Sequence, residues 1–189
     1  MRLFIACPVP EEIKNKIADL ESEFRVSNAD VKWVRPESIH LTLKFLGEVD
    51  EDKISEINNK ISKAIEGFSV FRAVVEKIGV FPDWKRIRVV WVGIEDGQRE
   101  LKELSKSVED KMANIGFKKE KRGFTAHITI GRVRSGRSID RLIDMVREKS
   151  DISLGAIQIS EVLLMQSILR PEGASYKCLE RFNLDRKEL

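Results

Sequence analysis

The sequence of 189 residues is poor in the side chains that carry much of protein chemistry. It has two cysteines, two histidines, one tyrosine and only three threonines. Two cysteines, Cys7 and Cys178, cannot build a disulfide framework, and their scarcity favours a protein of the reducing cytosol. Hydrophobic residues make up 42% of the chain and charged residues 34%, which excludes a low-complexity or disordered chain. The length suits one large domain or two small lobes with a substantial core.

Long apolar runs and a strong charge of one sign are also missing. The apolar run near the N-terminus ends at Pro8 and Pro10, too early for a signal peptide or a membrane span. We therefore expect a cytoplasmic protein without membrane contact, and we expect a monomer. The 34 basic residues exceed the 31 acidic ones by only three, so any nucleic-acid binding must come from a local basic patch.

The apolar residues that are present predict alternating helices and strands. Spacings of three or four, with charged residues on the other faces, are typical of helices lying on a sheet, and they predict helices over 13–24, 54–65, 101–115 and 139–146. Runs rich in β-branched and aromatic residues predict strands at 2–7, 40–46, 70–81, 86–94, 125–133, 157–169 and 176–182.

The order of these elements repeats after 87 residues. This offset relates Pro10 to Gly97, His40 to His127 and Val70 to Ile157. We interpret the repeat as an internal duplication of one domain into halves of about 1–82 and 86–170, giving two similar α+β lobes related by a pseudo-two-fold axis. A strand at 175–183 would complete the sheet. Regular alternation of helices and strands could produce an apparent repeat by itself, so the interpretation depends on the residues at equivalent positions.

The two histidines provide that support. His40 begins the run His-Leu-Thr-Leu and His127 begins His-Ile-Thr-Ile, so each histidine is followed two residues later by a threonine. Side chains alternate across a strand, so His40 and Thr42 project from one face, and His127 and Thr129 do the same in the second copy. With the lobes related by a two-fold axis, the two pairs can face each other across a cleft.

This set of groups suits metal-free cleavage of a phosphodiester. Two imidazoles with pKa values near 6.5 can serve as general base and general acid at neutral pH, and the hydroxyls beside them can donate hydrogen bonds to phosphoryl oxygens. A lone histidine on a β-strand usually has a structural role, but here two histidines occur with the same threonine neighbour. A zinc site would need His40, His127, Cys7 and Cys178, none of which have the close spacing of zinc ligands. We predict neither a metal nor a cofactor.

The chain also resembles a known family, the two-histidine (2H) phosphoesterases, in the branch of RNA 2′,3′-cyclic phosphodiesterases that is also named 2′-5′ RNA ligase. The resemblance covers nearly the whole chain. Around the first motif it rests on Trp33-Val-Arg-Pro-Glu-Ser-Ile-His-Leu-Thr-Leu-Lys-Phe-Leu-Gly, and around the second on Phe124-Thr-Ala-His-Ile-Thr-Ile-Gly-Arg. Ala126 is a departure, because many relatives have proline there; we expect little effect on chemistry.

The resemblance implies an α+β fold with two pseudo-symmetric lobes, each having an antiparallel sheet and two helices, and an active-site cleft between them. It implies hydrolysis of a terminal RNA 2′,3′-cyclic phosphate, including tRNA-derived ends, to a 2′-phosphate. His40 is then the proton donor and His127 the proton acceptor, while Thr42 and Thr129 hold the phosphate. It also implies 2′-5′ ligation to a 5′-hydroxyl RNA, in which the two histidines exchange roles.

Further residues are candidates for substrate binding. Lys44, at i+4 from His40, and Arg122, ahead of the second motif, fit the cleft side and could follow RNA phosphates. Arg132 lies at i+5 from His127, on the opposite face if the strand is regular. Phe81, Trp84 and Tyr176 could stack a base, whereas Trp33 and Trp91 are expected in the core.

Three alternatives stay open from the sequence. The same site could belong to an RNA 3′-end exonuclease or to a cyclic phosphodiesterase acting on a small nucleotide or ADP-ribose derivative. A non-enzymatic alternative is a module that holds RNA ends without turnover, although binding alone would be better served by arginine or lysine than by two histidines.

Overall fold

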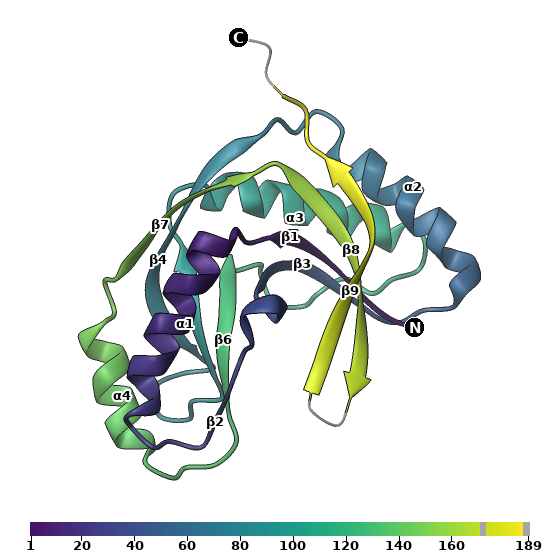
Figure 1. The fold of residues 1–189 in the computed structure, drawn as a ribbon. Coiled ribbons are helices and arrows are strands. Elements are labelled where there is room, and N and C mark those ends of the chain that lie inside the picture. The colour runs from purple at the N-terminus through teal and green to yellow at the C-terminus, as the bar shows by residue number, and fades with distance from the viewer. Residues whose placement is uncertain (171–172, 187–189) are drawn as a thin grey trace.

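The computed structural model describes residues 1–170 and 173–186, which form four α-helices and two antiparallel sheets (Figure 1). The helices are α1 (Glu11–Arg25), α2 (Ile54–Ile65), α3 (Gln98–Ala113) and α4 (Ile139–Glu148). The strands are β1 (Arg2–Pro8), β2 (Val31–Trp33), β3 (His40–Glu48), β4 (Phe71–Phe81), β5 (Val89–Ile94), β6 (His127–Val133), β7 (Ser153–Ile159), β8 (Glu161–Arg170) and β9 (Gly173–Asn183). Short 3-10 turns cover Pro36–Ser38 and Glu51–Lys53.

Each sheet carries two helices on one face and so forms one lobe. The four-stranded sheet has the order β3-β1-β8-β9 and packs against α2 and α3; the five-stranded sheet has the order β2-β6-β5-β4-β7 and packs against α1 and α4 (Figure 1). The apolar faces that the helical spacing predicts are buried there, for example at Ile17 and Leu20 of α1 and at Leu104 and Val108 of α3. The predicted α+β fold of two lobes with antiparallel sheets is confirmed.

The two lobes do not coincide with the two halves of the sequence. Strand β4 of the first half lies between β5 and β7 in the five-stranded sheet, and β8 of the second half lies between β1 and β9 in the four-stranded sheet. The first half thus gives β4, together with the short edge strand β2, to the five-stranded sheet, and the second half gives β8 to the four-stranded sheet. Two helices cross in the same way, because α1 covers the sheet of β5 and β6 while α3 covers the sheet of β1 and β3.

Most predicted elements are present, and one prediction is wrong. The run 157–169 is not one strand: it divides at Ser160 into β7 and β8, which belong to different sheets. The sequence does not mark the break because apolar, strand-favouring residues stand on both sides of it, Ile157 and Ile159 before and Val162 after. The short strand β2 was not expected, since three residues give too little pattern. Among the described residues no helix is long and apolar enough to cross a membrane.

Glycine sets the start of α3. Gly97 has a φ of 80°, and a Cβ there would approach the carbonyl oxygen of Arg72 to 2.6 Å. Only glycine fits this left-handed position against β4. The position corresponds to Pro10 before α1, where a fixed φ serves the same purpose of starting a helix.

Candidate active site

Both histidine motifs lie on edge-proximal strands that face each other between the lobes. His40 and Thr42 are half-buried on β3, while Leu41 and Leu43 between and after them are buried in the core. His127 and Thr129 on β6 show the same alternation with Ile128 and Ile130. Strands β3 and β6 belong to different sheets and contact each other. The fold thus brings the two His-Thr pairs to one junction.

Equivalent backbone hydrogen bonds fix both imidazoles. Nδ1 of His40 lies 2.7 Å from the carbonyl oxygen of Ser38, and Nδ1 of His127 lies 2.7 Å from that of Thr125. A carbonyl only accepts, so Nδ1 of each ring carries the proton and donates. The lone pair of each neutral imidazole is therefore on Nε2, and each Nε2 can either take up a proton or, once protonated, give one away.

Both imidazoles favour the neutral form. The pKa of His40 is lowered to about 4, mainly by burial; the hydrogen bond to Ser38 opposes this lowering and the positive charge of Arg132 adds to it. The pKa of His127 is lowered by the same two causes, with burial the larger. A single guanidinium thus acts on both rings, which indicates that Arg132 lies at the junction of the two motifs. Bound phosphate would offset this charge.

A β-bulge in each motif strand decides which later residues share the face of the histidine. In β3, Thr42 is opposite Ala6 but Lys44 is opposite Ile5, so Leu43 is an extra residue. In β6, Thr129 is opposite Trp91 but Gly131 is opposite Val90, so Ile130 is the extra residue. The extra residue reverses the alternation beyond it. The two bulges stand at equivalent points of the repeat.

The bulge in β3 makes the prediction for Lys44 wrong. Lys44 is only 2% exposed, and its ammonium group reaches Glu109 on α3. It donates to Oε1 of Glu109 at 2.6 Å and to the carbonyl oxygen of Lys118 at 2.9 Å. Glu109 Oε1 also accepts from the backbone N–H of Glu120 at 2.9 Å. Lys44 therefore anchors the segment that leads to the second motif and cannot bind substrate phosphate.

The bulge in β6 has the opposite consequence for Arg132. A regular strand would place this residue on the far face, but the extra Ile130 returns it to the face of His127 and Thr129. Arg132 is exposed, as is Lys32, its cross-strand neighbour on β2. Lys32 is a candidate that sequence reasoning missed, because β2 itself gives no signal. Arg132 and Lys32 together form a basic edge beside the second motif.

Aromatic rings frame both histidines. Phe81 meets the ring of His127 edge-on with centroids 5.0 Å apart, and Trp91 lies 6.2 Å from it. Around His40, Phe4 lies at 4.7 Å and Tyr176 at 5.1 Å. Phe81 and Tyr176, predicted to contact substrate, thus border the histidines.

One prediction for the tryptophans is confirmed and one is wrong. Trp33 lies in the core and stacks on Phe24 at 5.9 Å. Trp91 lies beside His127 instead, because its ring occupies the space over Gly79, where a Cβ would come within 2.1 Å of it. Trp84 lies under the guanidinium of Arg147 at 5.0 Å, so it packs against α4.

Arg122 is exposed in the segment between α3 and β6, and no hydrogen bond or ion pair of its side chain is found among the described residues. Its role in substrate binding stays a prediction. Cys7 is fully buried in the core and, paired opposite Leu41, faces away from His40. The four-ligand zinc set considered from the sequence therefore does not assemble, and the described residues contain no cluster of three or more histidine, cysteine or carboxylate side chains suited to a metal.

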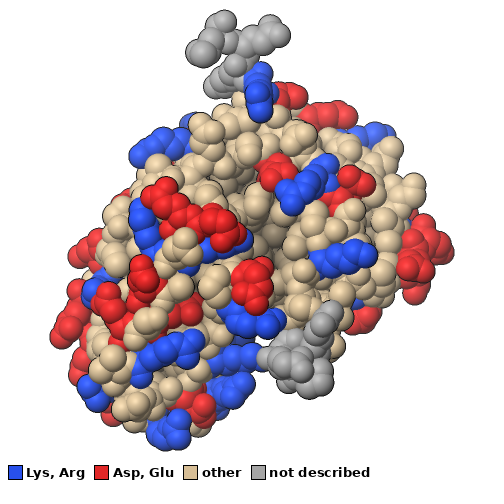
Figure 2. Space-filling view, in the orientation of Figure 1, with Lys and Arg blue, Asp and Glu red and all other residues tan. Residues whose placement is uncertain are grey.

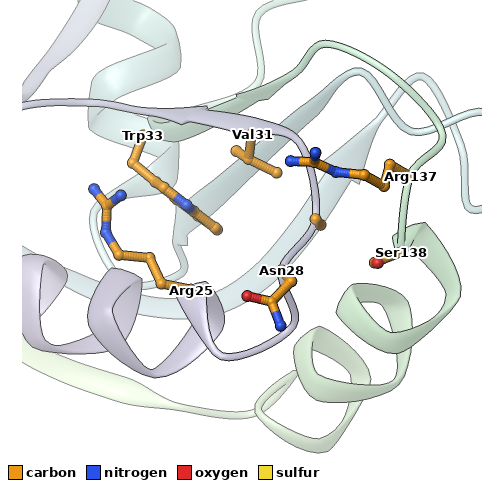
Figure 3. Close-up of a pocket in the computed structure, with 7 residues that line it drawn as sticks. Arg25, Asn28, Val31, Trp33, Arg137 and Ser138 are labelled. Carbon is orange, nitrogen blue, oxygen red and sulfur yellow. The ribbon is translucent and has the colours of Figure 1, made fainter.

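A pocket of about 490 Å³ lies elsewhere, between the end of α1, strand β2 and the start of α4 (Figure 3). It contains none of the predicted site residues and is bordered by Arg25, Asn28, Val31, Trp33, Arg137 and Ser138. Acidic and basic side chains are interspersed over the face of the molecule shown in Figure 2, in keeping with the nearly balanced charge. The pocket therefore does not contain the histidines, the threonines or Arg132, which lie at the β3–β6 junction.

Comparison with protein families gives a match in both halves of the chain. The family model described as LigT like Phosphoesterase matches residues 7–91 and again residues 92–176. Each match contains one histidine motif, at His40 and at His127.

Full-length relatives are similar in sequence. A protein of Archaeoglobus fulgidus is 39% identical over 96% of this chain and 99% of its own length, and one of Methanothermobacter thermautotrophicus is 34% identical over 97% and 99%. Both are named RNA 2′,3′-cyclic phosphodiesterase. Among solved structures, a protein of Thermus thermophilus has a TM-score of 0.83 at 24% identity over 100% of both chains. E. coli LigT complexed with 3′-AMP has a TM-score of 0.79 at 24% identity over 98% of both. These structures share the fold.

Proposed function

The chain belongs to the LigT-like phosphoesterase family, and we propose on that footing that it hydrolyses the 2′,3′-cyclic phosphate at an RNA end to a 2′-phosphomonoester. The observation that carries the proposal is the meeting of two His-Thr pairs on β3 and β6, with both Nδ1 atoms committed to backbone carbonyls. The names of the full-length relatives support the substrate.

The geometry suggests one acid–base step. Nε2 of neutral His127 takes a proton from water as the water oxygen attacks phosphorus. The bond from phosphorus to the ribose 3′ oxygen breaks, and Nε2–H of protonated His40 gives its proton to that oxygen. The hydroxyls of Thr42 and Thr129 and the Arg132 guanidinium stabilise the charge on the remaining phosphoryl oxygens. The assignment of donor to His40 and acceptor to His127 comes from family resemblance, since their hydrogen bonds are equivalent.

The same displacement accommodates ligation. A 5′-hydroxyl of a second RNA in place of water would attack the cyclic phosphate, and loss of the 3′ oxygen would leave a 2′-5′ linkage. This activity, the monomeric state, the cytoplasmic location and a metal-independent reaction remain predictions from the sequence.

The experiment offers the protein three matched oligoribonucleotides, ending in a 2′,3′-cyclic phosphate, a 3′-phosphate or a 3′-hydroxyl, and separately a small cyclic phosphate of ADP-ribose. Among the oligoribonucleotides we expect only the first to react, with retained length and a 2′-phosphate as product. Because general acid–base catalysis contributes about 10²- to 10⁴-fold, His40→Gln and His127→Gln should each lower kcat by that factor. EDTA should have no effect.

The controls separate the alternatives. Lys63→Ala, on the exposed face of α2, should leave activity unchanged. Shortened products would indicate an exonuclease, turnover of the small ADP-ribose derivative alone would indicate a nucleotide enzyme, and tight binding without product would indicate a binding module. Full activity in either histidine variant would rule out the proposed mechanism.

A further inference from the structure

The strand beside each motif strand carries an aromatic ring at the same place of the repeat. The offset of 87 residues that relates the two histidines also leads from Phe4 to Trp91. Phe4 lies on β1, the neighbour of β3, and Trp91 lies on β5, the neighbour of β6. The ring centroid of Phe4 is 4.7 Å from that of His40. The ring centroid of Trp91 is 6.2 Å from that of His127. An aromatic ring from the adjacent strand therefore packs against each imidazole.

In the second copy the ring is larger, and two glycines make room for it. Gly79 on β4 is the cross-strand partner of Trp91. Gly93 stands two residues after Trp91, on the same face of β5, and is the cross-strand partner of His127. A Cβ at Gly79 would come within 2.1 Å of the indole, and a Cβ at Gly93 within 3.1 Å. The six-membered ring of the indole thus lies directly over both glycines, next to the imidazole.

The indole and a phenyl ring together restrict the imidazole of His127. Phe81 lies 5.0 Å from the imidazole and 5.2 Å from the indole, measured between ring centroids. Nδ1 of His127 is fixed by its hydrogen bond to the carbonyl oxygen of Thr125, but a ring held at one atom can still tilt about that bond. Packing against neighbouring side chains removes this freedom, because a functional side chain keeps its orientation only when both packing and hydrogen bonding hold it.

The indole of Trp91 has no polar reason to be there. Its Nε1 is buried and finds no acceptor in the part of the chain that the structure describes, and a donor buried without an acceptor costs free energy. The first copy of the repeat has Phe4 at the equivalent position, which provides an aromatic ring without an N–H. We therefore attribute the role of Trp91 to the packing of its ring against His127.

We propose that Trp91 is a positioning residue for His127, whose indole holds the imidazole in the orientation that presents Nε2 to the substrate phosphate and to the attacking water. The inference rests on the proposed cyclic phosphodiesterase activity. Trp91 acts through His127, so its loss affects the chemical step more than substrate binding. An imidazole that is free to tilt is less often aligned, and a misplacement of about 1 Å can lower a rate about 10²-fold.

The kinetic test uses the difference between the two copies, with adenosine 2′,3′-cyclic phosphate as substrate. Trp91→Leu removes the aromatic ring and should lower kcat about 10- to 100-fold with little change in KM. Trp91→Phe installs the ring of the first copy and should restore kcat to within about 3-fold of the wild type. Gly79→Ala keeps Trp91 but places a methyl group against the indole, so it should lower kcat as Trp91→Leu does. Phe71→Leu, which removes a half-buried ring at the other end of β4, is the control and should leave kcat unchanged.

A second readout does not depend on turnover. The pKa of His127 is lowered mainly by burial, and the indole is part of what buries the ring. Trp91→Leu should therefore raise the titration midpoint of His127 toward 6.5 in an NMR spectrum, and it should leave the midpoint of His40 in place. Trp91→Phe should return the midpoint of His127 toward the wild-type value.

Three results would overturn the assignment: an unchanged kcat in Trp91→Leu, a loss that appears only in KM, or equal losses in Trp91→Leu and Trp91→Phe. If Trp91→Leu does not fold, Gly79→Ala and Trp91→Phe still decide. Failure of the proposed activity is recognised separately, because the wild-type protein would then turn over no cyclic phosphate. The titration alone decides in that case, and a midpoint of His127 that is the same in the wild type and in Trp91→Leu would disprove the role of the indole.

Discussion

At the level of single residues, the two histidines present a problem of protonation. Acid–base catalysis needs one imidazole charged and one neutral, yet both rings are buried, both use Nδ1 for a backbone carbonyl and both are near Arg132. The free protein therefore holds two neutral rings at pH 7. A phosphodiester anion would change this balance, because its negative charge favours an imidazolium. Substrate binding itself would then generate the acid.

Removal of the Arg132 charge should raise both histidine pKa values. In Arg132→Met the repulsion between the guanidinium and each imidazolium is lost, so protonation becomes easier at both rings. The chain has only two histidines, so two imidazole resonances titrate in an NMR spectrum, and His40→Gln assigns them. Wild-type midpoints are expected below 6.5, with that of His40 the lower. Arg134→Met, an exposed neighbour on the same segment, is the control; midpoints unaffected by Arg132→Met would refute the shared influence.

The pH dependence of turnover should differ between its two kinetic parameters. The profile of kcat/KM reports the free enzyme, in which the pKa of His40 is about 4 and that of His127 is also lowered. Both limbs of kcat/KM should therefore lie below pH 6.5, as apparent values of the pair. The alkaline limb of kcat should lie at higher pH, because bound phosphate raises the pKa of the acid. Coincident limbs above pH 6.5 would contradict this account.

At the level of elements, the two bulges determine which side chains share a face with the histidines. On β3 the bulge turns Lys44 into the interior and Phe45 to the face of His40, and on β6 the bulge returns Arg132 to the face of His127. Lys44 has a structural role instead of binding substrate. Its hydrogen bonds join β3 to α3 and to the segment before the second motif. The strand that carries His40 is thereby fixed to the segment that leads to His127.

Lys44→Met should therefore destabilise the fold and leave catalysis per folded molecule largely intact. The substitution leaves the carboxylate of Glu109, of which 17% is exposed, without its cation, and breaking a buried pair costs about 3–5 kcal/mol. Urea unfolding measures the loss of free energy, and kcat/KM is measured well below the transition. Lys106→Met removes an exposed pair with Asp110 and should cost less than about 1 kcal/mol. A large loss of kcat/KM in a Lys44→Met protein of unchanged stability would contradict this structural role and indicate that Lys44 binds substrate.

The limits of sequence reasoning lie at these same bulges. The helices, most strands and the two His-Thr pairs follow from periodicity, which depends only on neighbouring residues. A bulge instead depends on the register with another strand, so no local pattern distinguishes Lys44 as buried or Phe45 as exposed. The break at Ser160 is hidden for a similar reason: apolar, strand-favouring residues stand on both sides of it, and only the pairing with other strands shows that β7 and β8 belong to different sheets. Phe45 and Arg132 are equivalent positions of the repeat. The face of one could have been predicted from the face of the other, but only after one of the two bulges was known.

At the level of the whole molecule, the exchange of β4 and β8 between the sheets makes the lobes mutually dependent. Without β4, the five-stranded sheet would lose the strand between β5 and β7; without β8, the four-stranded sheet would lose the strand between β1 and β9. The order β3-β1-β8-β9 also matches β6-β5-β4-β7 strand for strand, which is the arrangement that the proposed duplication would give. Neither half carries all the strands of its own lobe.

The chain should consequently unfold in a single transition, although proteins of this length often populate intermediates. Natural probes report each lobe separately: Trp33, Trp84 and Trp91 all lie on or beside the five-stranded sheet, while the single tyrosine, Tyr176, lies on β9 of the other. Tryptophan fluorescence and ¹⁹F NMR of fluorotyrosine-labelled protein, followed through the same urea titration, should give one midpoint and one slope. Two separate midpoints would mean that one lobe stays folded after the other has unfolded. The exchange of strands between the sheets would then not make the unfolding of the two lobes cooperative.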